Sequence, residues 1–293
     1  MQLAANGISL EVEDHGPPTG EPLLLVMGLG MQLLGWHEGF VDTLVERGFR
    51  VIRYDNRDIG LSTSFDAAGV PNLAVDSLRY AIGMRVKSAY SLSDMAADAA
   101  GVLDALGLPS AHVCGASMGG MIAQRLAADA PERIRSLTLM MTSSGSRKLP
   151  GPSLKVRGAL IARPQTATIE GIVEHYVALY GLIGSPAFPA TKDDLRERFT
   201  RSVKRSYRPA GTARQMVAIA ADGDRSGVLA GLRMPTHVIH GAADVLVPVQ
   251  AGRDLAARIA GATLDVVEGM GHDLPPELWP RFAEGIAGAA GRA

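Results

Sequence analysis

The pattern of apolar positions divides the chain into short runs rich in apolar residues and longer segments with helical spacing. The run at 21–27 is apolar from its second residue onward and stops at the glycines of 28–30. A short run of this kind, closed by glycine, is typical of a strand that is buried on both faces of a parallel sheet. Similar runs predict the other strands of a sheet: 49–55, 111–115, 135–141, 236–240 and 263–268.

The segments between these runs have the spacing of helices. Residues Ser91–Asp94 have the sequence of a capping box, which predicts a helix that begins there and ends near Leu106. Strands that alternate with helices indicate βαβ units and a mainly parallel sheet. The other helices are expected before Gly48, at 118–130, at 254–259 and after the last strand.

The alternation stops after Met141 and resumes at Thr236. Between them the pattern predicts helices at 168–182, 192–207 and 210–221, broken by prolines, and no convincing strand. We therefore expect an α/β core that is formed by 1–141 and 233–293. Residues 142–232 are expected to be a helical lid, inserted over the carboxyl edge of the sheet.

Composition and charge narrow the class of protein. The 293 residues are 47% hydrophobic and carry a net charge of −1, so no global field favours nucleic acid or an anionic membrane. No apolar run approaches the roughly 18 residues that cross a bilayer, and the first residues do not have the pattern of a signal peptide. We expect a cytoplasmic protein without a nucleic-acid or membrane partner. The single cysteine, Cys114, lies in an apolar strand pattern and is expected to be structural.

The most specific motif is Gly115–Gly119, in which Ser117 lies between a predicted strand and a predicted helix. This G-x-S-x-G pattern is typical of a nucleophile elbow, a sharp turn that lifts the serine hydroxyl above the sheet. The two flanking glycines allow the strand and the helix to approach closely. Ser117 is therefore the candidate nucleophile.

A serine hydroxyl needs a base to become a nucleophile, and His272 is the candidate. It ends the glycine-rich loop Gly269–His272, just after the last predicted strand, and so should lie at the same sheet edge as Ser117. The other histidines are expected on the surface, at strand starts, on an inserted helix or within a strand: His15, His37, His112, His175, His237 and His240.

The base in turn needs a carboxylate that orients it. Asp244 follows the strand at 236–240 and also lies at the carboxyl edge of the predicted sheet. An isolated aspartate in such a loop is more often a turn residue or a helix cap. Here, however, the chain order serine, aspartate, histidine is the order that this motif requires.

An oxyanion requires two N–H donors. The backbone of Met118, the residue after the nucleophile, should supply one, and the loop after the first apolar run should supply the other, from Leu29. Gly28 and Gly30 would let that loop approach the substrate closely. The spacing of these glycines is not that of a dinucleotide-binding motif.

These motifs together resemble the α/β-hydrolase family. The resemblance rests on the loop at 27–30, the stretch Asp55–Ser62, the elbow, the loop at 240–248 and the loop at 269–272. It implies an eight-stranded, mostly parallel sheet with a helical lid, and a bracing role for Asp55–Ser62. The closest similarity is to bacterial carboxylesterases of the aclacinomycin-methylesterase kind, which share a methionine before the oxyanion glycine, as Met27 precedes Gly28.

We expect the inserted block to cover the substrate pocket, because elements above the sheet edge shape such pockets. Residues 192–214 contain eight Lys or Arg against three Asp or Glu. This excess would suit an anionic substrate or partner, although charge runs on helices usually face water. Trp36 fits a position in the hydrophobic core as well as it fits the wall of the pocket. The candidate lining residues are Gly28, Gly30, Trp36, Leu182, Ile183, Phe188 and Met216.

The expected activity is hydrolysis of a small-molecule carboxylic ester through an acyl-enzyme. No metal-binding motif and no phosphate-binding loop is recognised, so no metal or cofactor is expected. A lactonase, a carbon–carbon bond hydrolase and a perhydrolase would use the same three residues and stay open as alternatives. A ligand-binding receptor with a slow triad is an alternative from another class, because the fold does not determine the function.

Overall fold

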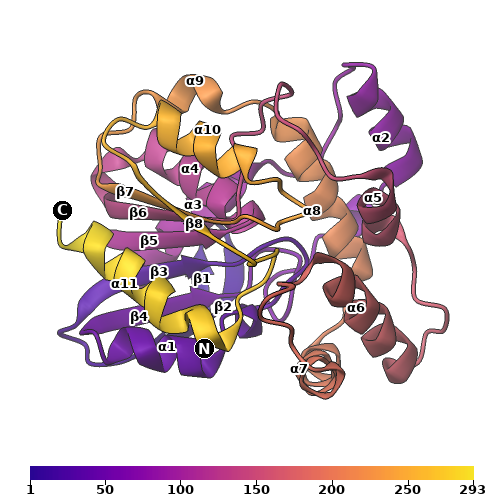
Figure 1. Cartoon of the computed structure of the whole chain (residues 1–293), viewed down its shortest axis with the longest axis horizontal. Helices are drawn as coiled ribbons and strands as arrows, with labels where there is room; N and C mark the ends of the chain where they lie inside the picture. Colours follow the sequence, from indigo (N-terminus) through magenta and orange to yellow (C-terminus); the bar gives the residue numbers. More distant parts are fainter.

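The computed structural model describes residues 1–293 and contains one eight-stranded sheet in the order β1-β2-β4-β3-β5-β6-β7-β8 (Figure 1). From β3 to β8 all neighbouring strands run parallel, whereas β1 and β2 pair antiparallel at one edge. The strands are β1 (Gln2–Ala5), β2 (Ile8–His15), β3 (Glu21–Val26), β4 (Phe49–Tyr54), β5 (Ala111–Ala116), β6 (Ile134–Met140), β7 (Thr236–Gly241) and β8 (Thr263–Val267).

The six strands from β3 to β8 coincide with the predicted apolar runs. Strands β1 and β2 were not predicted from the apolar pattern. In β2 only Leu10 and Val12 are buried, and they alternate with residues that reach solvent. Such a strand lacks the continuous apolar run that marks strands covered on both faces. With β1 and β2 the sheet has eight strands, as the family resemblance implies.

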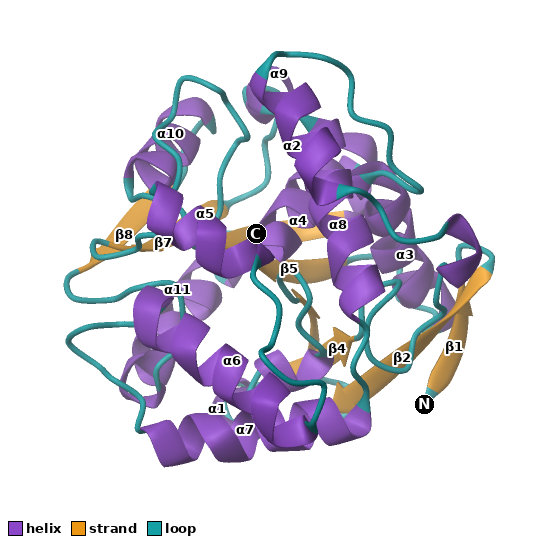
Figure 2. Ribbon diagram, turned by 90° about the vertical axis from the view of Figure 1, so that its right-hand side faces the viewer, coloured by secondary structure: helices purple, strands orange, loops and turns teal.

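Helices cover both faces of the sheet (Figures 1 and 2). Helices α1 (Glu38–Val45) and α11 (Trp279–Ala290) pack on one face, and α3 (Leu92–Ala105), α4 (Met118–Asp129) and α10 (Gln250–Arg258) pack on the other. The capping box predicted at the start of α3 is present, because the Ser91 and Asp94 side chains each accept the other residue's backbone N–H.

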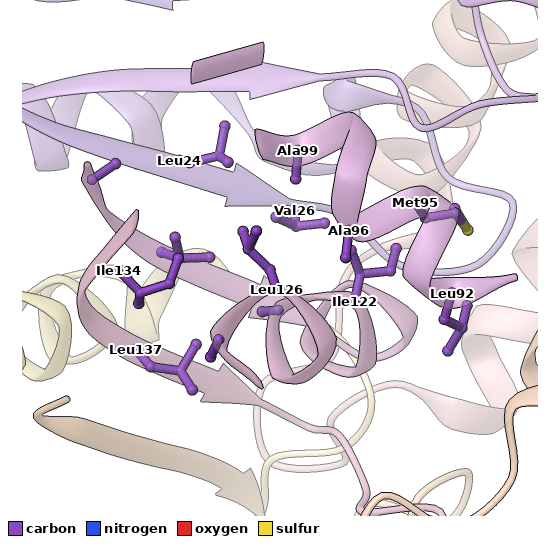
Figure 3. Close-up of a cluster of buried hydrophobic side chains, with 14 of the residues drawn as sticks. Leu24, Val26, Leu92, Met95, Ala96, Ala99, Ile122, Leu126, Ile134 and Leu137 are labelled. Carbon is purple, nitrogen blue, oxygen red and sulfur yellow. The ribbon is translucent and has the colours of Figure 1, made fainter. Parts of the chain in front are cut away.

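Two hydrophobic clusters form the core, one on each face of the sheet. The larger contains 31 buried residues and joins the sheet to α3, α4 and α10, with Ile122 and Leu126 of α4 against Leu24 and Val26 of β3 (Figure 3). The smaller contains 20 buried residues on the face of α1 and α11. Cys114 is fully buried in this second cluster, where burial raises the pKa of its thiol.

The chain between β6 and β7 is helical. Its helices within 154–222 lie beyond one end of the strands, at the right of Figure 1, whereas the short helix at 226–229 lies beside α4 and α10. This part of the chain contains the three predicted helices and two more that the pattern did not predict. The five are α5 (Leu154–Ile161), α6 (Ile169–Ile183), α7 (Lys192–Arg205), α8 (Pro209–Asp222) and α9 (Ser226–Leu229). A further unpredicted helix, α2 (Leu73–Ala81), lies nearby and buries none of its residues. No helix is both long and apolar enough to span a bilayer.

The packing of α4 on the sheet predicts how stability responds to a cavity. Ile122 has no solvent exposure and belongs to the larger cluster, whereas Leu154 is 85% exposed. We expect Ile122→Ala to lower the free energy of unfolding by about 2–5 kcal/mol, because it removes buried methyl groups and leaves a cavity. Leu154→Ala, the matched control, should change it by less than about 0.5 kcal/mol. Urea titration measures both, and an equal effect would contradict this description of the core.

Burial of His112 predicts a pH-dependent loss of stability. His112 is 2% exposed at the start of β5, with Nδ1 2.8 Å from the Ser136 hydroxyl, and burial lowers its pKa from 6.5 to about 4. The unfolded chain therefore binds this proton more readily than the folded protein. Neutral His112 makes its full contribution to the free energy of unfolding above pH 6.5. As the pH falls towards 4 this contribution is lost, and the free energy of unfolding decreases by up to about 1.4 kcal/mol per pH unit. His112→Gln should flatten this part of the stability curve, and an unchanged slope would contradict the assignment.

Candidate active site

Ser117 lies at the turn between β5 and α4 in a backbone conformation that few residues with a side chain adopt. Its φ is 54° and its ψ is −120°, and its side chain is half-buried. A positive φ at a residue other than glycine is strained and persists only where the surrounding structure holds it. Such a turn at a serine is the geometry expected for a nucleophile elbow.

The glycines of the motif permit the close packing that holds this turn. A Cβ atom on Gly119 would overlap with the carbonyl group of Val26 in β3, and a Cβ on Gly115 would overlap with the backbone of Gly119. The first turn of α4 therefore lies directly against the ends of two strands. Gly28 approaches the serine from the other side, since a Cβ there would lie 3.2 Å from the Ser117 Cβ.

The structure brings Ser117, His272 and Asp244 together from three separate loops. The His272 Nε2 lies 3.0 Å from the Ser117 Oγ, and the His272 Nδ1 lies 2.7 Å from the Asp244 Oδ2. His272 is 8% exposed and Asp244 is 5% exposed, so water has little access to either. The distances are those of a serine–base–carboxylate chain of hydrogen bonds.

Backbone N–H groups orient the carboxylate of Asp244. Its Oδ1 accepts hydrogen bonds of 2.8 Å from the N–H groups of both Leu246 and Val247, which leaves Oδ2 directed at His272. His240 is the other histidine near this carboxylate, with Nε2 3.7 Å from Oδ2. Burial lowers the pKa of His240, and its Nε2 lies 2.7 Å from the carbonyl oxygen of Val247. His240 is therefore a neutral, packed strand residue, as its position in the sequence predicts.

The end of α6 holds the loop that carries His272. The backbone N–H of His272 donates to the carbonyl of Ile183 at 2.7 Å, and the N–H of Gly271 donates to the Ser185 hydroxyl oxygen at 2.9 Å. The Ser185 hydroxyl and N–H both donate to the carboxylate of Asp273. Burial raises the pKa of Asp273, while these hydrogen bonds favour its charged form. No sequence signal pointed to Ser185 or Asp273.

The loop at 27–30 is held by two polar side chains. Asn56 donates to the carbonyl of Met27 at 2.8 Å, which supports the bracing role expected for Asp55–Ser62. Gln215 of α8 accepts from the N–H of Gly30 at 2.9 Å and donates to the carbonyl of Arg57. The N–H groups of Leu29 and Met118 donate to no acceptor in the protein. Both are therefore free to bind a ligand.

Several basic residues of 192–214 bind carboxylates of the core. Arg205 pairs with the fully buried Asp55 at 2.7 Å, and Arg214 pairs with the fully buried Asp58 at 2.7 Å. Arg201 pairs with Glu38 at the surface. The buried pairs attach α7 and α8 to the loop that follows β4. Part of the positive charge in this stretch is therefore neutralised by carboxylates of the protein, while Lys192, Arg196, Arg201 and Lys204 are exposed to water.

The candidate lining residues have different surroundings. Trp36 has no solvent exposure and stacks on Phe40 within the smaller core cluster. Ile183 is buried on α6, while Leu182, Phe188 and Met216 are half-buried on or near the inserted helices. Gly28 is buried against Ser117, and Gly30 lies against Thr212 of α8. A narrow pocket beside Gly30 lies between the loop at 27–30 and α6–α8 and is lined by Met31, Tyr176, Phe199, Arg208 and Thr212, among others.

The fold and this geometry define a class: a serine hydrolase on a mostly parallel α/β sheet. Residues 21–277 match the family model described as the alpha/beta hydrolase fold. The chain is 31% identical to rhodomycin D methylesterase DauP of Streptomyces sp. (strain C5), over 97% of this chain and 95% of that protein. It is also 31% identical to rhodomycin D methylesterase DnrP of Streptomyces peucetius, over 95% of this chain and 94% of that protein. The chain belongs to the α/β-hydrolase family.

Solved structures agree on the fold. The meta-cleavage product hydrolase CumD of Pseudomonas fluorescens IP01 has a TM-score of 0.76 at 21% identity and covers 99% of this chain and 96% of its own. The enol-lactonase of Burkholderia xenovorans LB400 has a TM-score of 0.76 at 24% identity and covers 99% of both chains. The family, the α/β-hydrolase fold and the esterase-type hydrolase class predicted from the sequence are thereby confirmed.

The hydrogen bonds of Ser185 predict that it positions His272. Ser185→Ala removes the acceptor of the Gly271 N–H and one donor to Asp273, so the histidine loop should shift. We expect kcat for ester hydrolysis to fall on the order of 10–100-fold with KM changed by less than about twofold. Ser185→Thr keeps the hydroxyl and should retain most of the activity. A Ser185→Ala variant with a lower melting temperature but unchanged kcat and pH profile would show that Ser185 is merely structural.

Proposed function

We propose that the protein is a carboxylesterase that cleaves its substrate through an acyl-enzyme on Ser117. The observation that carries this proposal is the chain of hydrogen bonds from Asp244 through His272 to Ser117, at 2.7 and 3.0 Å. Holding a serine in a strained turn together with a buried base and a buried carboxylate lowers the stability of the folded protein. Acyl transfer is the chemistry that needs all three.

In the first half of the reaction, Ser117 attacks the ester carbonyl carbon. The Nδ1–H of His272 donates to Asp244, so Nε2 is left unprotonated and accepts the proton of the serine hydroxyl. Negative charge develops on the carbonyl oxygen, and the free N–H groups of Leu29 and Met118 stabilise it. The position of Met118 at the start of α4 adds the positive end of the helix dipole. His272 then protonates the leaving alcohol.

In the second half, water releases the acid. Once the alcohol has left, His272 again has an unprotonated Nε2 and takes a proton from a water molecule next to the acyl carbonyl. The same two N–H groups stabilise the second oxyanion. Collapse of this intermediate returns the proton to Ser117 and frees the carboxylic acid.

Residues 142–232 act in this proposal as the lid of the pocket. The block contacts both halves of the reacting centre: the end of α6 binds the loop of His272, and Gln215 of α8 binds Gly30. Leu182, Ile183, Phe188 and Met216 come from this block and would give the pocket its apolar wall. The lid would thus select the substrate and help to hold the catalytic loops in place.

A carboxylic methyl ester is the substrate class that the relatives favour. The two methylesterases match nearly the whole chain, including the inserted block that would shape the pocket. A carbon–carbon bond hydrolase is the alternative, because a 2-hydroxy-6-oxononadienedioate/2-hydroxy-6-oxononatrienedioate hydrolase of Pseudomonas sp is 28% identical over 90% of the chain. The same serine, histidine and aspartate would serve that reaction.

Substitution of the three residues tests the mechanism. Ser117→Ala and His272→Ala should each lower kcat for p-nitrophenyl acetate on the order of 10⁴–10⁶-fold, because the residues act as a unit. Asp244→Asn should lower it on the order of 10⁴-fold, since the amide no longer stabilises the productive tautomer. His15→Ala, at the far end of β2, is the matched control and should retain wild-type activity. Full activity in any of the three variants would refute the assigned role.

The substrate class can be tested with paired substrates. We expect sustained release of methanol from carboxylic methyl esters, and no cleavage of a 2-hydroxy-6-oxo-dienoate, whose loss of absorbance reports carbon–carbon bond cleavage. The reason is that the two methylesterases resemble the chain more than the dienoate hydrolase does, at 31% against 28% identity, and that His272 is placed to protonate the alkoxide that leaves an ester. The reverse preference, abolished by Ser117→Ala, would identify a carbon–carbon bond hydrolase instead.

A further inference from the structure

The exposed apolar side chains of the protein are concentrated in two short segments. Fourteen large hydrophobic side chains are exposed, and eight of them lie in 70–84 and 154–161, in and around α2 and α5. Leu154 is 85% exposed and Val70 is 71% exposed. A concentration of this kind on one face is unusual for a monomer and marks an interaction surface. The eight are Val70, Val75, Leu78, Tyr80, Ile82, Met84, Leu154 and Ile161.

The two segments meet on the same face of the molecule. The Arg147 guanidinium lies 4.8 Å from the centre of the Tyr80 ring and donates a hydrogen bond to the Tyr80 carbonyl. Figure 1 shows α2 and α5 at the same end of the molecule, beyond the sheet, and in Figure 2 both lie towards the viewer. We name residues 70–88 and 145–163 together the α2–α5 surface.

The charges of the α2–α5 surface have one sign. It contains eight Lys or Arg residues and one acidic residue, Asp76, in a chain whose net charge is −1. Only Arg79 has an acidic partner, Asp76 at 3.5 Å, so the other seven are unpaired. These seven are Arg85, Lys87, Arg147, Lys148, Lys155, Arg157 and Arg163. The expectation of no membrane partner rested on the net charge, which averages over this local excess.

We propose that the α2–α5 surface binds the surface of an anionic lipid bilayer. Exposed apolar side chains that lie in the same segments as unpaired basic side chains fit the boundary between the acyl chains and the acidic headgroups of a bilayer. A second copy of this surface is a poor occupant, because two faces of the same positive charge repel each other. Nucleic acid is also a poor occupant, since seven of the eight apolar side chains have no ring to stack on bases and the ring of the eighth, Tyr80, lies against the Arg147 guanidinium. The protein would lie on the membrane, as no helix spans it.

Vesicle co-sedimentation tests this proposal without depending on the esterase activity. We expect the full-length protein to sediment with vesicles that contain phosphatidylserine and phosphatidylcholine, but not with vesicles of phosphatidylcholine alone. Binding should decrease as sodium chloride is added, because salt screens the attraction between the basic side chains and the headgroups. Absence of binding to the anionic vesicles at low salt would overturn the proposal, as would equal binding to both kinds of vesicle.

Paired variants separate the apolar and the electrostatic contributions. Leu154→Ser with Ile161→Ser, and Lys155→Glu with Arg157→Glu, should each lower the partition coefficient by at least about tenfold. All four side chains are exposed, so the fold should be unaffected, and an unchanged melting temperature checks this. The matched controls lie on other faces: Val228→Ser with Leu264→Ser, and Arg233→Glu with Arg253→Glu. Controls that lose binding as strongly as the surface variants would refute a localised site.

The outcomes also distinguish this inference from the proposed function. Protein that binds anionic vesicles but hydrolyses no ester would leave the surface in place and remove the esterase assignment. Protein that hydrolyses esters but binds no vesicle would keep the esterase assignment and overturn the proposed membrane surface. Binding of single-stranded DNA, lost in Lys155→Glu with Arg157→Glu but kept in Leu154→Ser with Ile161→Ser, would identify a nucleic-acid surface and overturn the lipid proposal.

Discussion

The close approach of α4 to the end of β3 is the constraint on which the site depends. Gly119 lies so near the carbonyl of Val26 that no side chain fits there, and the chain must reverse sharply between β5 and α4. Ser117 takes the resulting strained conformation, with its φ at 54°. The same reversal leaves the N–H of Met118 at the open end of a helix. The buried core that Ile122 and Leu126 form beneath α4 holds this strain in place.

A second set of interactions joins the inserted helices to the sheet through polar groups rather than apolar packing. Arg205 and Arg214 reach two buried aspartates of the loop after β4, and Gln215 bridges Arg57 and Gly30. On the other side, Ser185 binds the loop of His272. Buried pairs of this kind add orientation more reliably than net stability. The inserted block is therefore part of the framework that aligns the reacting groups.

Much of this arrangement could be predicted from the sequence, for identifiable physical reasons. Parallel strands covered on both faces are buried along most of their length and are rich in apolar residues, so β3 to β7 were visible, whereas half-exposed β2 was not. Ser117, Asp244 and His272 each follow a parallel strand, and the carboxyl ends of parallel strands meet at one edge. The contacts of Ser185 and Gln215 could not be predicted, because they join residues more than 80 positions apart through the packing of inserted helices. Helix α2 buries no residue, so no packing in the core marks its position.

Activation of Ser117 by His272 can be measured with a fluorophosphonate, which reacts only with a nucleophilic serine. An activated serine attacks the phosphorus atom and forms a stable adduct, which mass spectrometry of peptides can locate. We predict a single adduct, on Ser117, whose formation is orders of magnitude slower in the His272→Ala variant than in the wild-type protein. An adduct on another serine, or equally fast labelling of Ser117 without His272, would contradict it.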